Sequence, residues 1–180
     1  MQRASPARLL FVVVLTTLTT LLSACGFQLR GSSMPLKMST IALSLSPQSE
    51  LYGLLRQKID ASGTTRVVAE AKNAEAVFTV LGDSNGKSIQ SLSAAGRARE
   101  YQLTRTFSFK VESPTGGVYI APSIITVQRS MNFSDDQVLA KEAEETLLAR
   151  DMQDDLVRQI MRRLGAAKLK PGSDTETAEK

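Results

Sequence analysis

The chain has 180 residues, of which 42% are hydrophobic, and its 22 Lys and Arg against 18 Asp and Glu give a formal net charge of +4. It contains no histidine, no tryptophan and one cysteine, which excludes Ser-His-Asp and Cys-His catalysis and the usual His/Cys zinc sites. This length is enough for one domain with its own hydrophobic core.

Residues 1–24 have the pattern of a secretory signal peptide. Arg3 and Arg8 form a positive start, residues 9–22 are apolar apart from threonines, and Ser23-Ala24 supply small side chains before a cleavage point. The apolar run is shorter than the roughly 20 residues that a membrane-spanning helix needs. Removing this segment leaves 20 basic against 18 acidic residues, so the remaining charge argues against a nucleic-acid partner.

The single cysteine follows directly. Leu22-Ser23-Ala24-Cys25 resembles a bacterial lipobox, in which the thiol receives diacylglycerol and the new amine is acylated, for example with palmitate. An internal disulfide is impossible with one cysteine. One acyl chain anchors a protein marginally, whereas several anchor it firmly. Because Gly26 and not Asp follows, we expect lipidation of Cys25 to hold the chain on the periplasmic face of the outer membrane.

Residues 25–38 are expected to form a lipidated tether, followed by a single domain over 39–165. Residues 41–45 alternate as in a half-buried strand. Ser46-Pro47 suits a helix start, with Ser as cap and Pro at the first position. Apolar residues then recur at helical spacing up to Gly63: Leu51, Leu54, Leu55 and Ile59. A strand, a helix and a further strand in succession predict a crossover with parallel pairing.

The middle of the chain is rich in strands. Residues 66–68 are a candidate short strand and 76–82 a clear one. Asn85-Gly86 is compatible with a tight hairpin turn or with a bulge in one long bent strand, and the pattern leaves both open.

Residues 99–112 show the cleanest alternation, with an apolar face formed by Tyr101, Leu103, Phe107, Phe109 and Val111. Arg105 is the exception on this face, so we expect it to meet a carboxylate or to reach solvent, since an unpaired buried charge is costly. After a turn at Pro114 and Gly116-Gly117, a last strand places these residues on one side: Ile125, Val127, Met131 and Phe133.

A long helix is predicted to close the domain. Ser134 and Gln137 are spaced as a capping box, and Phe133 and Val138 as a hydrophobic staple. Asp135-Asp136 lies at the positive end of the helix dipole and basic residues lie near its other end. A stripe at every fourth position should face the sheet: Leu148, Met152, Leu156, Ile160 and Leu164. After Gly165, residues 166–180 have almost nothing to bury and are expected to be disordered.

Paired carboxylates are the remaining candidates for catalysis. Asp135-Asp136, Glu144-Glu145 and Asp154-Asp155 all lie in the helical pattern, where sequence neighbours point in different directions. A solvated helix face explains them better than an acid/base pair, so we do not expect an enzyme, and no cofactor or metal is expected.

Three motifs after the lipobox resemble the LptE family of lipopolysaccharide-assembly lipoproteins from Gram-negative bacteria. Residues 25–31 (CGFQLRG) are similar to the family's mature N-terminus, and 100–103 (EYQL) to its central strand. Residues 137–141 (QVLAK), with the following Glu144-Glu145 and later 159–160 and 163–164, are similar to its last helix. The resemblance implies an α+β fold: a two-layer α/β sandwich with two helices packed on a mixed sheet of about four main strands.

The resemblance also implies a function. Such a protein plugs the lumen of the outer-membrane β-barrel LptD, assists its assembly and helps deliver lipopolysaccharide to the cell surface. Family members are thought to bind lipopolysaccharide through basic side chains, which suits its phosphates. One such position carries over to Lys141. A second falls near Ala94, which is not basic, and Arg97 and Arg99 are the candidates to replace it.

Alternatives stay open at this point. Arg97 and Arg99 are equally well explained as solvent-facing charges that keep a strand from aggregating, whereas Lys141, near a helix start, gains nothing from the helix dipole. The whole chain could instead be an auxiliary or structural envelope lipoprotein of a periplasmic lipid-transport system. An enzyme with a Ser-Lys or carboxylate-only site is a third, weaker alternative.

Overall fold

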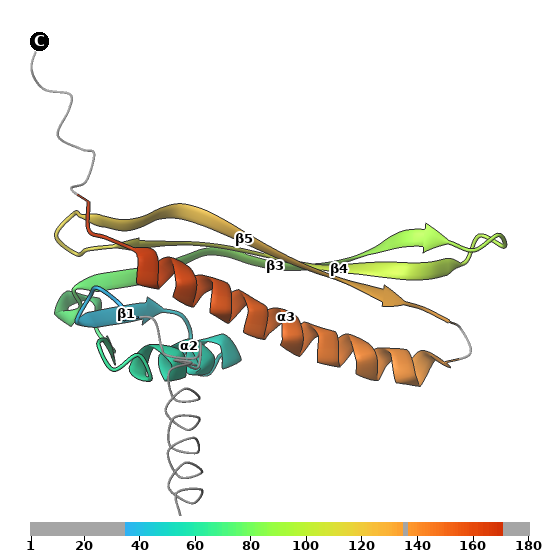
Figure 1. Ribbon diagram of the computed structural model, residues 1–180, viewed down its shortest axis with the longest axis horizontal. Helices are drawn as coiled ribbons and strands as arrows, with labels where there is room; N and C mark the ends of the chain where they lie inside the picture. The colour runs from blue at the N-terminus through green and yellow to red at the C-terminus, as the bar shows by residue number, and fades with distance from the viewer. Residues whose placement is uncertain (1–34, 135–136, 171–180) are drawn as a thin grey trace, which may run out of the picture. The chain divides into compact units, whose positions relative to one another are not determined.

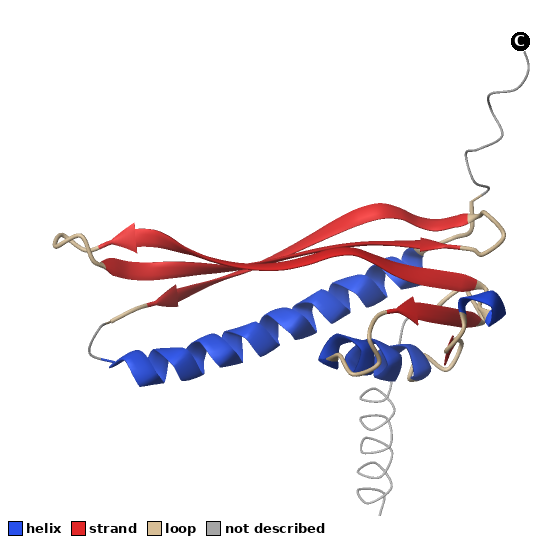
Figure 2. Cartoon of the chain, turned by 180° about the vertical axis from the view of Figure 1, so that it is seen from behind, coloured by secondary structure: helices blue, strands red, loops and turns tan. Residues whose placement is uncertain are grey.

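The computed structural model describes residues 35–134 and 137–170, which form a two-layer α+β unit (Figures 1 and 2). One layer is a five-stranded mixed sheet of order β2-β1-β3-β4-β5, and both helices cover the same face of it. We call this the helix-side face and its opposite the open face. The predicted fold class is confirmed, with a short fifth strand beside the four main ones. The elements are β1 (Thr40–Ser44), α2 (Glu50–Asp60), β2 (Arg66–Val68), the 3-10 turn η1 (Ala71–Asn73), β3 (Ala76–Leu92), β4 (Ala98–Glu112), β5 (Val118–Asn132) and α3 (Val138–Ala166).

The first half contains the predicted crossover, since β1 pairs in parallel with both β2 and β3. Helix α2 starts later than predicted. Its cap is Ser49, whose side chain accepts from the backbone N–H of Tyr52, while Ser46 and Pro47 form the preceding turn in which the Ser46 carbonyl accepts from Ser49 at 2.9 Å. The Ser49 hydroxyl lies three residues before the N–H that needs it, which the Ser46 hydroxyl cannot reach. After the helix Gly63 adopts a positive φ of 71°, a conformation that glycine allows at little cost.

The second half is a meander of three long antiparallel strands. Asn85 and Gly86 lie in the interior of β3, opposite Arg105 and Thr104, in a stretch of regular register. The alternative of one long strand is therefore confirmed over the hairpin, but the register shifts lie between Val80 and Gly82 and after Ile89, and not at Asn85-Gly86. Continuous pairing with β4 outweighs the local turn preference of the Asn-Gly pair.

The core lies between the helix-side face and the two helices. The alternation predicted for β4 is confirmed, because Leu103, Phe107, Phe109 and Val111 are buried. Phe78 and Phe109 stack with ring centroids 4.9 Å apart. Helix α3 buries the predicted stripe, together with Val157: Met152, Leu156, Ile160 and Leu164, with Leu148 packed at its margin.

The start of α3 differs from the prediction. The helix begins at Val138 with Gln137 as its cap residue, and the Gln137 side chain makes no capping hydrogen bond. The Phe133 ring packs edge-on against Tyr101 of β4, with centroids 5.2 Å apart, while Val138 remains 45% exposed. Phe133 thus packs against the sheet and does not form the predicted hydrophobic staple with Val138. Asp135 and Asp136, predicted to lie at the helix dipole, fall outside the described residues.

The folded body extends past both predicted boundaries. Leu36 and Met38, placed by the sequence in the tether, are buried in the core. After α3, Ala167 is buried, and Lys170 exchanges two backbone hydrogen bonds of 2.9 Å with Val118 of β5. A Cβ atom on Gly117 would lie 2.4 Å from Leu169, so this glycine permits the close approach. Residues 166–170 therefore differ from the expected disorder after residue 165, and residues 171–180 lie outside the described ones.

Candidate functional site at the start of helix α3

The structure places the predicted basic residues at one end of the folded unit. The β3–β4 turn, which contains Arg97, and the first turn of α3, which contains Lys141, lie at the same end (Figure 1). Arg99 is the second residue of β4 and is exposed, as is Arg97. Gly96 supplies the positive φ of 74° that the turn requires. Residues up to 44 positions apart in sequence are thereby gathered at what we call the α3-start end.

A chain of contacts joins this strand to the helix. The backbone N–H of Phe133 donates to the carbonyl of Arg99 at 2.9 Å, and the Phe133 ring meets Tyr101. The Nζ atom of Lys87 lies 4.7 Å from the centre of the Tyr101 ring and 2.5 Å from Oε2 of Glu145 on α3. A cation over an aromatic ring and an ion pair together fix this lysine between strand and helix.

Lys87 was missed by the sequence reasoning. It follows Asn85-Gly86, and a hairpin turn there would have paired it with Ser84 and not with Leu103. The alternative of one long strand would have located Lys87, because alternate residues of a strand share one face. In that register Lys87 lies opposite Leu103 on the helix-side face.

The two lysines at the α3-start end are already paired with carboxylates. Nζ of Lys141 lies 2.7 Å from Oε2 of Glu144, one helical turn on, and its side chain is only 16% exposed. An anionic ligand would have to compete with Glu144 for Lys141 and with Glu145 for Lys87, because each carboxylate cancels most of its partner's charge. The arginines extend the basic surface along the strand end, where they are solvent-accessible.

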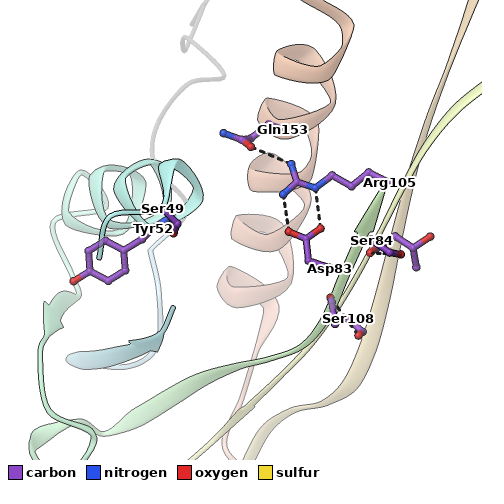
Figure 3. Close-up of polar contacts among 9 residues, drawn as sticks. Ser49, Tyr52, Asp83, Ser84, Arg105, Ser108 and Gln153 are labelled. Atoms are coloured by element: carbon purple, nitrogen blue, oxygen red, sulfur yellow. Dashed lines mark hydrogen bonds and ion pairs between the residues drawn. The ribbon is translucent and has the colours of Figure 1, made fainter. Parts of the chain in front are cut away.

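Arg105 forms the best-organised ion pair of the domain (Figure 3). Its Nε and Nη2 atoms donate to the two carboxylate oxygens of Asp83 at 3.0 and 2.8 Å, and Nη1 donates to Gln153 of α3 at 3.0 Å. The prediction that this charge on the apolar face is paired is confirmed.

Two further clusters of hydrogen-bonded side chains join the sheet to neighbouring segments. Asp155 of α3 accepts from Arg129 of β5 and from Arg158, and these two bonds, Arg129 first, lower the pKa of its carboxyl group. Asp155 thereby links the helix to the edge of the sheet.

The second cluster lies where the folded body begins. Glu75 accepts from the backbone N–H of Ser39 at 2.7 Å and from the hydroxyl of Tyr119 at 2.8 Å. These bonds, Ser39 first, lower the pKa of Glu75. Burial, with the bond to Glu75, raises the pKa of Tyr119 to about 12.

The polar side chains of these sites are engaged in ion pairs and hydrogen bonds. Among residues 35–134 and 137–170, no group of three His, Cys, Asp or Glu side chains is arranged to hold a metal ion. In the same ranges, no helix has the length and apolarity to cross a membrane. The Glu144-Glu145 and Asp154-Asp155 pairs are explained by ion pairs and a solvated face, with Glu144, Glu145 and Asp155 each bound to a basic side chain.

Comparison with known proteins identifies the type of chain. Residues 38–164 match the model of the family described as LptE, lipopolysaccharide-assembly. The LPS-assembly lipoprotein LptE of Pectobacterium atrosepticum is 28% identical over 157 residues, which cover 86% of this chain and 84% of the relative. An uncharacterized lipoprotein B from Nitrosomonas europaea, solved by NMR, is 32% identical with a TM-score of 0.65, covering 78% of this chain and 91% of its own. The rare lipoprotein B from Shewanella oneidensis is 26% identical with a TM-score of 0.62, covering 71% and 95%.

Proposed function

This chain belongs to the LptE family of lipopolysaccharide-assembly lipoproteins, and from that premise we propose that it plugs the outer-membrane barrel LptD, assists its assembly and helps deliver lipopolysaccharide. The chain is a non-enzymatic member of the assembly machinery of the envelope. The observation that carries the proposal is the extent of the family match, since residues 38–164 comprise nearly all of the folded body.

The open face of the sheet supports the role of a plug. In the middle of the three long strands its side chains are uncharged: Ser84 and Ser88 on β3, Gln102, Thr104, Thr106 and Ser108 on β4, and Ile124, Thr126, Gln128 and Ser130 on β5. Charged side chains of these strands lie only toward the ends of β4 on this face, with Glu100 at one end and the Lys110–Glu112 ion pair at the other. The lumen of a large outer-membrane barrel is polar. Hydroxyl and amide groups can exchange hydrogen bonds with such a wall, and contact through the middle of this face desolvates no ionised group, which would be costly.

Lipid attachment is the second part of the proposal. Residues 1–24 would be removed and Cys25 would carry the acyl chains, with the outer membrane as the destination. Both segments lie outside the described residues. The folded body begins by Leu36, which leaves about ten residues between the lipid and the domain. An extended chain gains at most about 3.5 Å per residue, so the body would stay within about 35 Å of the membrane.

Direct binding of lipopolysaccharide is the third part, with Lys141, Arg97 and Arg99 as the contacts to phosphate. The β3–β4 turn, the start of β4 and the start of α3, which carry them, lie at one end of the unit and support a shared ligand (Figure 1). The ion pair between Lys141 and Glu144 supports the alternative hypothesis, in which this lysine stabilises the helix and does not bind a ligand.

Co-purification tests the barrel partner against the main alternative, an auxiliary lipoprotein of a periplasmic lipid-transport system. We would solubilise outer membranes in detergent and isolate the tagged full-length chain. Retention of LptD through washing at high salt is expected. Recovery of the lipidated chain without a barrel, or with inner-membrane transport proteins instead, would contradict the proposal.

A further inference from the structure

Most of strand β3 lacks a neighbour on one side. β1 pairs only with residues Ala76 to Thr79, and from there to Leu92 the strand is paired with β4 alone. Every residue from Asp83 to Gln90 is exposed. In an antiparallel ladder alternate residues direct their N–H and C=O groups away from the partner strand. The described part of the chain offers those backbone groups no partner, so β3 presents an open hydrogen-bonding edge.

The opposite edge of the same sheet is treated differently. On β5, Val118 is bridged by Lys170, Pro122 has no N–H to offer, and the Ile124 carbonyl accepts from Arg163 of α3 at 2.9 Å. Such devices prevent unwanted strand pairing. These devices cover β5 from Val118 to Ile124, whereas among the described residues none covers β3 from Asp83 to Gln90.

A groove runs beside the open edge. It has a volume of about 520 Å³ and is lined by Asn85, Gly86 and Lys87 of β3, by Thr146 and Ala149 of α3, and by Glu50 at the start of α2. Leu103 and Met152, both buried, also line it and supply apolar surface. Because helices bound the groove as well as the strand, it has room for one extended segment but not for the edge of another folded sheet.

The charges around the groove cancel within the domain. Lys87 is paired with Glu145 and Arg105 with Asp83, which leaves Glu50 and Arg150 among the lining residues with opposite charges. A segment that is uncharged at its centre and carries an apolar side chain complements this surface. A strongly charged segment would be repelled by whichever of Glu50 and Arg150 carries the same sign of charge.

We propose that an extended segment of a partner polypeptide adds to the edge of β3 as an extra strand, in line with β1, and inserts an apolar side chain between Leu103 and Met152. The register is regular from Gly82 to Ile89 between two irregular points, so the added strand pairs over about this length. Main-chain hydrogen bonds supply affinity in strand addition, and the groove supplies specificity. The inference does not depend on which envelope protein donates the segment.

The test uses the full-length, lipidated chain in its own membrane. A photoreactive amino acid in place of Asn85 reports what lies on the edge, and mass spectrometry of the cross-linked peptide identifies it. Ala149→Trp fills the groove, and Ala143→Trp is the matched control on an exposed position of α3 that does not line the groove. Circular dichroism checks that both variants fold.

We expect cross-links to one segment of another protein, reduced at least tenfold by Ala149→Trp and unchanged by Ala143→Trp. In the purified complex, alternate amides between Asp83 and Ile89 should exchange at least a hundredfold more slowly than in the chain alone. Unchanged exchange, equal effects of the two tryptophans, or cross-links to a second copy or to residues 26–34 of the chain itself would overturn the proposal. If LptD co-purifies but the amides of the β3 edge exchange as fast as in the free chain, strand addition is wrong and the proposed barrel partner stands. If a protein other than LptD donates the strand, strand addition stands and the proposed barrel partner is wrong.

Discussion

Replacing Arg105 by methionine should destabilise the domain by about 2 kcal/mol. The side chain is 11% exposed and makes two charge-assisted hydrogen bonds to Asp83 and one to Gln153. Each such bond contributes on the order of 1.5 to 3 kcal/mol. Asp83 is 33% exposed, so it regains water when its partner is removed, which reduces the loss below the 3 to 5 kcal/mol typical of a fully buried pair.

A double-mutant cycle isolates the interaction. We would measure urea unfolding for Arg105→Met, Asp83→Val and the double variant in a chain that starts after the lipidation site. Because Arg105 lies between Leu103 and Phe107 on an apolar face, the double replacement should recover to within about 1 kcal/mol of the original stability. The half-exposed pair Lys110–Glu112 is the control, and Lys110→Met should cost less than about 1 kcal/mol. If Arg105→Met is as harmless as Lys110→Met, the pairing argument for Arg105 is wrong.

Three further predictions concern anchoring, ligand binding and pH. Cys25→Ala should leave a folded domain that fractionates away from the membrane; a variant that stays membrane-bound in the absence of any partner would contradict the lipobox interpretation. Lys141→Asp, and separately Arg97→Asp/Arg99→Asp, should each weaken binding of purified lipopolysaccharide at least tenfold with unchanged circular dichroism, since each removes charge-assisted contacts of about 1.5 to 3 kcal/mol; unchanged affinity in both folded variants would leave a purely structural plug. Because the pKa of Glu75 is lowered in the folded state, this carboxylate stabilises the fold at pH values above its ordinary pKa of 4.5, and the stabilisation is lost as the pH falls through the lowered pKa. Glu75→Gln should therefore flatten the acid limb of a plot of unfolding free energy against pH. An acid limb identical to that of the original chain would refute this assignment.

The sequence predicts the fold well where one strong pattern acts alone. Strict alternation in β4 and the four-residue repeat in α3 identify their buried faces, and even the exception at Arg105 is interpretable because an unpaired charge there would be too costly. The prediction is wrong where tertiary pairing competes with a local preference. Asn85-Gly86 stays extended because β4 continues beside it, and Phe133 turns to Tyr101.

The candidate site is less predictable for a related reason. The order of the elements is enough to predict that Arg99 and Lys141 lie at one end of the unit. The contact of Lys87 with Tyr101 and Glu145 depends on the register of β3, which the sequence pattern left open. The ion pair that limits Lys141 joins two residues three positions apart on α3. Lipidation of Cys25 and the ligand-binding roles of the basic residues stay predictions.

Depletion of this protein, followed by measurement of the folded LptD barrel in the outer membrane, tests whether the chain is a plug and assembly factor. We expect the amount of correctly assembled barrel to fall as the protein is lost and to return when the full-length chain is supplied again. Barrel assembly that continues at its normal level without the protein would contradict its proposed role as a plug and assembly factor.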